Sequence, residues 1–227
     1  MTKTIELPQV DPAERRRCAR LYKKLLDLYP DARCALNYTS PWELVVATIL
    51  SAQCTDVRVN KVTPDLFKAF PTPQAFAAST PKKIEPYVKT CGFFRNKAKN
   101  IHRAAIEVVE TFHGEVPRTM EDLLTLPGVA RKTANVVLGN AFNINAGVVV
   151  DTHIGRLSRR LAFTDHNDPV KVERDLAARF PQQNWTLLAH LLIEHGRQVC
   201  DARRPACSQC TLKRSCPQIG VEPEQMR

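Results

Sequence analysis

Glycine, strand-like alternation and long apolar runs are all scarce in this sequence. Only 8 of its 227 residues are glycine, against 16 prolines, so the turns are stiff and no glycine- and serine-rich linker is present. No apolar run approaches the length needed to span a bilayer. Internal repeats and low-complexity tracts are missing as well. These absences exclude a helical membrane protein, a repeat array and a chain of domains on flexible tethers.

Acidic residues are outnumbered by basic ones. The chain carries 33 Lys and Arg against 23 Asp and Glu, which gives a net charge of +10. A surplus of this size favours a polyanionic partner, either nucleic acid or an anionic membrane surface. Hydrophobic residues make up 44% of the chain, enough for a core, and the length suits one large domain or two small intertwined ones.

The N-terminal segment, residues 1–14, has no apolar signal core and contains acidic residues. It therefore predicts neither a secretory signal nor a transit peptide, and we expect a cytoplasmic protein whose thiols stay reduced. Four of the eight cysteines are scattered along the chain, and a buried structural thiol is the expected role of each. These four are Cys18, Cys34, Cys54 and Cys91.

Helix start signals recur along the chain and predict an all-α fold. Asp11-Pro12-x-Glu14 and Ser40-Pro41-Trp42-Glu43 each combine an N-cap, a proline and a capping acid. Residues 44–50 are apolar nearly all round, which predicts a central helix. The β-branched run at residues 146–150 is too short and solitary to found a sheet. Further helices are expected at residues 12–29, 56–70, 95–112, 119–126, 131–141, 152–161, 168–180 and 184–199, with a short one from residue 80.

The most informative helix pair lies at residues 119–141, with a tight turn at residues 127–130. This turn and the start of the second helix present backbone N–H groups at the positive end of a helix dipole, which suits a phosphate. Val129 can pack inward while Gly128 allows a close backbone approach. An ordinary antiparallel helix pair has the same pattern, so the segment alone leaves both interpretations open. Arg131 stands where a P-loop needs a second glycine, so nucleotide binding is rejected.

Lys132, in this hairpin, and Asp151, downstream of it, each allow an ordinary structural or binding role and a catalytic role. Lys132 can be one more phosphate-facing lysine, or a nucleophile if partial burial at the helix N-terminus disfavours its ammonium form. Asp151 follows the apolar run and precedes the helix at residues 152–161. It can be a plain N-cap, or a carboxylate that faces a developing cation or takes a proton from an amine. Neither residue decides between these roles alone.

The C-terminal cysteines have the pattern Cys200-x6-Cys207-x2-Cys210-x5-Cys216. Thiolates this dense are most simply explained by a shared metal centre, for which both zinc and an iron–sulfur cluster are candidates. A metallohydrolase site at His190 and Glu194-His195 is not expected. Its spacing matches no zinc helix motif, and the leucines around it favour packing or surface histidines.

These segments together resemble the endonuclease III family of DNA repair glycosylases, in the helix-hairpin-helix superfamily. The similarity extends from about Arg20 to Cys216. The motifs that carry it are residues 126–137 (LPGVARKTANVV), residues 150–153 (VDTH), residues 51–56 (SAQCTD) and the cysteine tail. The cysteine spacing and the paired Lys and Asp motifs are specific, whereas many DNA-binding proteins share the hairpin.

The resemblance implies two all-α lobes with DNA lying across the cleft between them. Residues 34–145 would form a six-helix barrel that carries the hairpin, and residues 1–33 with 146–227 would form an iron–sulfur cluster domain. The partner would be double-stranded DNA with a damaged base or abasic site. The protein would be a monomer, associated with the nucleoid through DNA, with no membrane and no nucleotide cofactor.

The resemblance also implies a bifunctional DNA glycosylase/AP lyase that excises oxidised or damaged pyrimidines in base excision repair. Lys132 would attack the sugar C1′ to form a Schiff base, and β-elimination would nick the strand. Asp151 would stabilise the cationic sugar and help to deprotonate Lys132. Cys200, Cys207, Cys210 and Cys216 would bind a [4Fe–4S] cluster.

DNA contacts are implied for several further residues. Gln53 would fill the gap left by a flipped nucleotide, and Phe93 would be the apolar wedge. His153 would touch the DNA backbone or, as we prefer, support Asp151. The turn would contact phosphate through Gly128, Val129, Ala130 and Arg131, and a basic loop held by the cluster would contribute Arg203 and Arg204, with Lys213 and Arg214 just beyond.

Three departures from the family pattern bear on substrate range. Ala130 stands where a second glycine is usual, so its methyl group could displace the phosphate or require a strained backbone. Phe93 replaces a more usual aliphatic wedge. The stretch between Lys132 and Asp151 is about one residue longer, around residues 143–146.

Two other functions remain as alternatives. A monofunctional mismatch adenine glycosylase shares the hairpin and cluster but typically lacks the lysine nucleophile and has an extra C-terminal domain. A non-catalytic helix-hairpin-helix module would use Lys132 only to hold phosphate.

Overall fold

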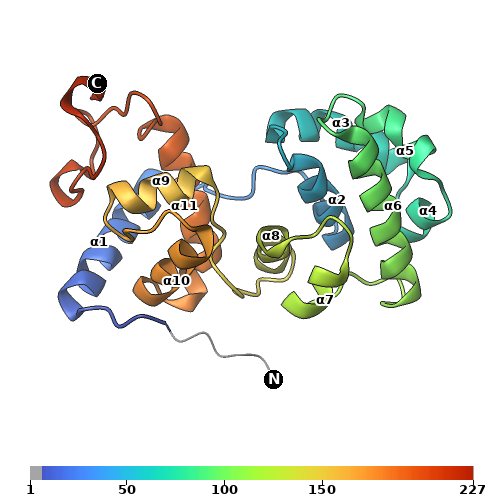
Figure 1. Ribbon diagram of the computed structural model, residues 1–227, viewed down its shortest axis with the longest axis horizontal. Coiled ribbons are helices and arrows are strands. Elements are labelled where there is room, and N and C mark those ends of the chain that lie inside the picture. Colours follow the sequence, from blue (N-terminus) through green and yellow to red (C-terminus); the bar gives the residue numbers. More distant parts are fainter. Residues whose placement is uncertain (1–6, 227) are drawn as a thin grey trace. The chain divides into compact units, whose positions relative to one another are not determined.

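The computed structural model describes residues 7–226, and every regular element in that range is helical (Figure 1). The predicted all-α class is confirmed, and residues 146–150 form no strand. Residues 1–6, part of the N-terminal segment predicted to contain no leader, lie outside the described residues. None of the helices within residues 7–226 is both long enough and apolar enough to cross a membrane.

The chain divides into two compact units. One, here the central unit, is residues 34–146, and the other, the terminal unit, combines residues 1–33 with residues 147–227. Each unit is described by itself.

The central unit is built around a buried helix. Residues 44–50 of α2 (Pro41–Ser51) are all buried, as their apolar pattern predicted. This helix packs against α3 (Asp56–Ala69), α6 (Phe94–Glu110) and α8 (Arg131–Ala141). The remaining helices of the unit are α4 (Pro73–Ala77), α5 (Pro81–Val88) and α7 (Met120–Thr125).

Side-chain caps start most of the helices in the central unit. The Ser40 hydroxyl accepts from the N–H of Glu43 at 3.2 Å, but the Glu43 carboxylate binds Thr39 rather than closing a capping box on Ser40. Helix α4 was missed, although the Thr72 hydroxyl accepts from the N–H of Ala75 at its start. The helix is one turn and a half long, too short for an apolar period to show.

The terminal unit packs four α-helices and three 3₁₀ turns within the described residues. Helices α9 (Thr152–Arg160) and α11 (Trp185–Gln198) contact each other, and α1 (Pro12–Leu28) packs on α10 (Pro169–Arg179) and α11. The 3₁₀ turns are η1 (Gln182–Asn184), η2 (Lys213–Ser215) and η3 (Pro223–Gln225).

The start of α1 differs from the prediction in one respect. The Asp11 carboxylate accepts from the N–H of Ala13 at 2.6 Å, as an N-cap does, but Glu14 is not a capping acid. Its carboxylate instead accepts from Arg17 at 2.6 and 2.7 Å. Arg17 also donates to the carbonyls of Ala162 and Ser215, both at 3.2 Å. Arg15 and Arg16 are exposed, whereas these contacts leave Arg17 half-buried.

Replacing Arg17 tests this anchor. We expect Arg17→Met to lower the free energy of unfolding by about 1–3 kcal/mol, because it removes two charged hydrogen bonds from the Glu14 carboxylate and leaves two carbonyls without the Arg17 donor. The exposed neighbour Arg16 provides the control, and Arg16→Met should change stability by less than about 0.5 kcal/mol. Urea unfolding of both variants measures this, and equal losses would contradict the assignment.

The pH dependence supplies a second check. The hydrogen bond from Arg17 holds the pKa of the Glu14 carboxyl below its ordinary value of 4.5. The ion pair therefore contributes fully above pH 4.5 and is lost as the pH falls through the lowered pKa of the folded state. The gap between wild type and Arg17→Met should shrink over that range.

Candidate functional site

The hairpin of α7 and α8 is formed as predicted. Gly128 has φ +86°, a conformation that disfavours any residue with a Cβ, and such an atom would lie 3.0 Å from the Cβ of Asn100. The N–H of Val129 donates to the carbonyl of Leu126 at 3.0 Å, and the Val129 side chain is buried. The turn is thus fixed by a glycine conformation on one side and by an apolar anchor on the other.

Ala130 does not strain the turn. It is the N-cap residue of α8, with the ordinary extended angles φ −93° and ψ 169°, so the strain considered for its methyl group is absent. Alanine offers no polar side chain, and no side chain caps this end of α8. The start of the helix therefore presents main-chain N–H groups and the positive end of its dipole beside an exposed turn.

Lys132 is exposed at the second position of α8, next to the half-buried Arg131. The partial burial that was the condition for a nucleophilic Lys132 is therefore not present in the protein alone. The residues that follow, Thr133, Ala134 and Asn135, are buried and pack α8 into the central unit. The lysine stands on a rigid helix end with its amine accessible.

Asp151 is the N-cap of α9, which is the structural role considered for it. Its Oδ1 accepts from the N–H of Ile154 at 2.8 Å, which fixes the carboxylate at the helix start. Its Oδ2 has no donor among residues 7–226. A half-exposed carboxylate held by one oxygen keeps the other available for a cation or a proton.

His153 bonds to a neighbour other than Asp151. Its Nδ1 lies 3.3 Å from Nη2 of Arg156, whose guanidinium also donates to the carbonyls of Gly196 and Cys200 at 3.3 and 3.0 Å. A Cβ added to Gly196 would lie 3.0 Å from this His153 nitrogen. In this structure His153 supports the packing of α9 against α11.

Gln53 and Phe93 lie on neighbouring turns of the central unit. Both are exposed, Phe93 by 69%, and both have left-handed backbones, with φ 52° and 56°. The turns approach closely, since a Cβ added to Gly92 would lie 3.6 Å from the carbonyl oxygen of Gln53. The structure therefore brings together two residues that lie 40 positions apart in the sequence.

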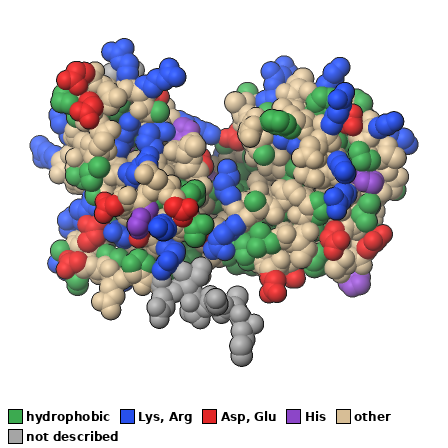
Figure 2. All heavy atoms as spheres, in the orientation of Figure 1, with side chains coloured by type: hydrophobic (Ala, Val, Ile, Leu, Met, Phe, Trp, Pro, Cys, Tyr) green, Lys and Arg blue, Asp and Glu red, His purple; other side chains and the backbone are tan. Residues whose placement is uncertain are grey.

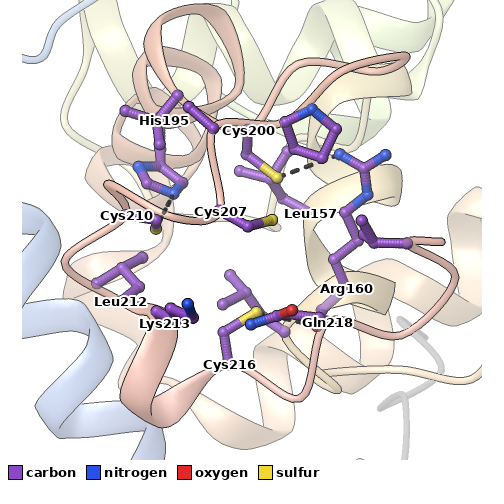
Figure 3. A pocket seen from close by; sticks show the side chains of 15 residues that line it. Leu157, Arg160, His195, Cys200, Cys207, Cys210, Leu212, Lys213, Cys216 and Gln218 are labelled. Atoms are coloured by element: carbon purple, nitrogen blue, oxygen red, sulfur yellow. Dashed lines mark hydrogen bonds between the residues drawn. The ribbon is translucent and has the colours of Figure 1, made fainter. Parts of the chain in front are cut away.

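The four C-terminal cysteines line one cavity of the terminal unit and form no disulfide (Figure 3). Two side chains from the helices are directed at their sulfurs. Nη1 of Arg160 donates to Sγ of Cys200 at 3.3 Å, and Nε2 of His195 lies 3.6 Å from Sγ of Cys210. The other ring nitrogen of His195 bonds to the hydroxyl of Tyr29 at 2.9 Å.

Arg160 and His195 were not predicted as parts of this site. Arg160 is buried and also donates to the carbonyls of Asp201 and Ala202 at 2.6 and 2.9 Å, which holds the loop that follows Cys200. His195 is buried, in line with the packing role expected for it. No sequence motif marks either residue, because each comes close to the cysteine segment only when the chain folds.

The donor set of the cysteine cavity is compatible with a metal cluster. Burial raises the pKa of Cys216 to about 11 and also raises those of Cys207 and Cys210, so these thiols would ionise only with a nearby positive charge such as that of a metal. Metal-bound thiolates accept hydrogen bonds from donors that point at their sulfur atoms. Among residues 7–226, no three His, Cys, Asp or Glu side chains are grouped to hold a single metal ion.

The loop between Cys200 and Cys207 is basic and exposed. The backbone N–H groups of Arg203 and Arg204 donate to Oδ1 of Asp201 at 2.9 and 3.1 Å, which orders the loop and leaves both arginine side chains at the surface. Lys213 and Arg214 are exposed just beyond Cys210. Figure 2 shows many other Lys and Arg side chains on the visible face of each unit.

The scattered cysteines match their expected role in part. Cys18 and Cys91 are buried, and burial raises the pKa of the Cys18 thiol to about 12. Cys34 and Cys54 are only partly buried.

Comparison with known proteins places this geometry in a family. Residues 46–182 match the family model for the HhH-GPD superfamily of base excision DNA repair proteins. The chain is 54% identical over 205 residues to endonuclease III of Synechocystis sp., covering 90% of this chain and 94% of that protein. It is 40% identical over 193 residues to endonuclease III of Escherichia coli, covering 85% and 91%.

Comparison with solved structures indicates the same family. A non-covalent endonuclease III–DNA complex has a TM-score of 0.84 and 39% identity, and covers 90% of this chain and 95% of that chain. A trapped endonuclease III–DNA covalent intermediate has a TM-score of 0.84 and 38% identity, and covers 90% and 96%. The chain therefore belongs to the endonuclease III family of the HhH-GPD superfamily.

Proposed function

We propose that this protein is a bifunctional DNA glycosylase and AP lyase of base excision repair, acting on damaged pyrimidines in duplex DNA. The observation that carries the proposal is the exposed Lys132 on the uncapped N-terminus of α8. A relative of 38% identity has been solved as a trapped covalent intermediate with DNA, which is the chemistry a nucleophilic lysine provides.

The hairpin docks a DNA phosphate. Its turn exposes Gly128 and Ala130, and the first N–H groups of α8 and its dipole favour an anion there. The net charge of +10 adds long-range attraction for the duplex. Because Ala130 keeps an ordinary backbone, phosphate binding does not depend on a second glycine at this turn.

The damaged nucleotide has to leave the base stack before a side chain can reach its sugar. Gln53 and Phe93 are the residues we assign to the space it leaves. Both are exposed on adjoining turns, so they can enter the duplex together. The large ring of Phe93 also gives the wedge a stacking surface for a neighbouring base.

The bond changes centre on the sugar C1′. The neutral amine of Lys132 forms a bond to C1′ while the bond from C1′ to the base breaks, and the base leaves with its electron pair and gains a proton. Opening of the sugar ring gives the Schiff base. Loss of a C2′ proton then expels the 3′ phosphate by β-elimination, and water releases the lysine by hydrolysing the imine.

Asp151 is the carboxylate we assign to this reaction. Its held Oδ1 and open Oδ2 suit a group that stabilises a cationic sugar and takes a proton from the lysine ammonium. The binding to Arg156 indicates that His153 orders the start of α9 rather than acting as an acid or base.

The cysteine cavity is assigned to a [4Fe–4S] cluster. Cys200, Cys207, Cys210 and Cys216, which line one cavity, would hold it. With four protein ligands such a cluster would have no open position, so it would supply structure rather than catalysis. Arg160 and His195 steady two of the sulfurs, and the loop then presents Arg203 and Arg204 to the DNA backbone.

Borohydride trapping on duplex DNA with one abasic site tests the nucleophile. Wild-type protein should form a covalent adduct, and Lys132→Ala should form none because the amine that makes the imine is gone. Lys68→Ala removes an exposed lysine of α3 and should trap normally. Release of a damaged pyrimidine should fall about 100-fold or more in Asp151→Asn. A Lys132→Ala protein that still traps, or a wild type that cuts only abasic DNA, would refute the proposal.

The basic cluster loop has its own test. Replacing Arg203 and Arg204 together by Ala should weaken binding to every duplex and reduce the slope of log K against log salt by about 2, because each arginine neutralises roughly one phosphate. The visible absorbance of the cluster should stay unchanged. A matched pair on α1, Arg15→Ala with Arg16→Ala, makes the same change in charge and should leave the slope as it is. Equal slopes for both double variants would show that only net charge matters.

A further inference from the structure

The two residues assigned to the gap in the duplex, Gln53 and Phe93, are held in conformations that ordinary residues avoid. Left-handed backbone costs free energy at any residue other than glycine and persists only where the surroundings impose it. The Gln53 turn at the end of α2 is closed by a bond from the N–H of Cys54 to the carbonyl of Ser51 at 3.0 Å, and Phe93 is the N-cap of α6 with no side-chain cap. These local features do not fix the two turns relative to each other, which needs a contact of longer range.

Lys97 supplies that contact. Although it is a lysine, it is only 5% exposed, and its Nζ donates to the carbonyl of Leu50 at 2.8 Å. Leu50 lies in the last turn of α2, where carbonyls have no partner within the helix, three residues before Gln53. The Lys97 side chain therefore ties down the helix end from which the Gln53 turn departs.

The backbone of the same residue holds the second turn. The N–H of Lys97 donates to the carbonyl of Phe93 at 3.1 Å, the first hydrogen bond of α6. One residue thus binds the Phe93 turn through its main chain and the Gln53 turn through its side chain. The two turns also lie close together, since the Cys91 thiol interacts with that of Cys54, and a Cβ added to Gly92 would lie 3.6 Å from the carbonyl oxygen of Gln53.

A buried lysine at position 97 is unfavourable if its only role is to stabilise the fold. Burying an amino group is unfavourable unless it is paired, and an apolar side chain of similar length would fill the same space without that cost. A capping role could also be met by water at an exposed helix end. What lysine adds is a directed bond of fixed length between two turns that carry exposed residues.

We propose that Lys97 is a positioning residue that sets the separation of Gln53 and Phe93 so that both enter the duplex in register. The inference rests on the proposed function of these two residues. Lys97 does not touch the reacting atoms, and its effect is confined to steps that open the base stack. Single-stranded DNA has no opposite strand to part, so its abasic sites need neither residue.

The test compares single-turnover cutting of one abasic strand, alone and in a duplex. Lys97→Met keeps the length of the stem and removes the donor to Leu50. We expect cutting of the duplex to fall about ten-fold or more and cutting of the single strand to change less than about two-fold. Lys99→Met, on the exposed face of α6, makes the same charge change and should alter neither rate.

A double substitution separates positioning from a general loss of packing. If Lys97 acts through the wedge, Lys97→Met should add little to the duplex defect of a protein that already carries Gln53→Ala and Phe93→Ala. Should Lys97→Met not fold, as judged by circular dichroism, Lys97→Gln takes its place under the same criteria, since its shorter amide stem weakens the bond while keeping a buried polar group.

The outcomes are distinct. A duplex-selective defect that disappears in the double-alanine background supports the inference. Equal loss on both substrates, no loss on either, or full additivity with the alanine variants overturns it. Wild-type protein that gives no borohydride adduct on either substrate would instead refute the proposed function itself.

Discussion

Long cationic side chains that donate to main-chain carbonyls hold the loops of this protein in place. Lys97 binds the carbonyl of Leu50, Arg160 binds those of Asp201 and Ala202, and Arg17 binds those of Ala162 and Ser215. In each case the acceptor lies where a helix ends or a loop turns, so the carbonyl has no helical partner. A chain with few glycines cannot shape such loops by backbone freedom alone, and these bonds provide the shape instead.

The same interaction explains why exposed residues of the proposed site have defined positions even though they lie on loops. Gln53, Phe93, Arg203 and Arg204 are all exposed, yet each follows or precedes a segment that a buried cation holds. The hairpin is the exception, because its turn depends on the left-handed conformation of Gly128 and on the buried Val129. A loop that is fixed before DNA arrives loses less conformational entropy on binding.

Local signals in the sequence predicted most of the helices. The features that these signals did not predict depend on contacts between residues far apart in the chain. Asp11 and Ser40 start helices as predicted because a cap acts within three residues. Glu14 carried the same signal, but Arg17 competes for its carboxylate with a charged bond. Lys97 and Arg160 looked like ordinary members of amphipathic helices, since their acceptors lie 47 and 41 residues away along the chain. The exposure of Lys132 could not be predicted from the sequence either, because it depends on how α8 packs.

The exposure of Lys132 changes how its amine can be activated. Lys132 is exposed, so burial within the protein is not the means by which the proposed nucleophile is activated. Two other effects would favour a neutral amine. One is the positive end of the α8 dipole, which disfavours a positive charge at the helix N-terminus, and the other is the removal of water when a duplex covers the hairpin. If Lys132 is the nucleophile that we propose, its activation is then tied to DNA binding. The exposed lysine and the uncapped helix end would act together, because a phosphate bound at that end would also bring the sugar to the lysine.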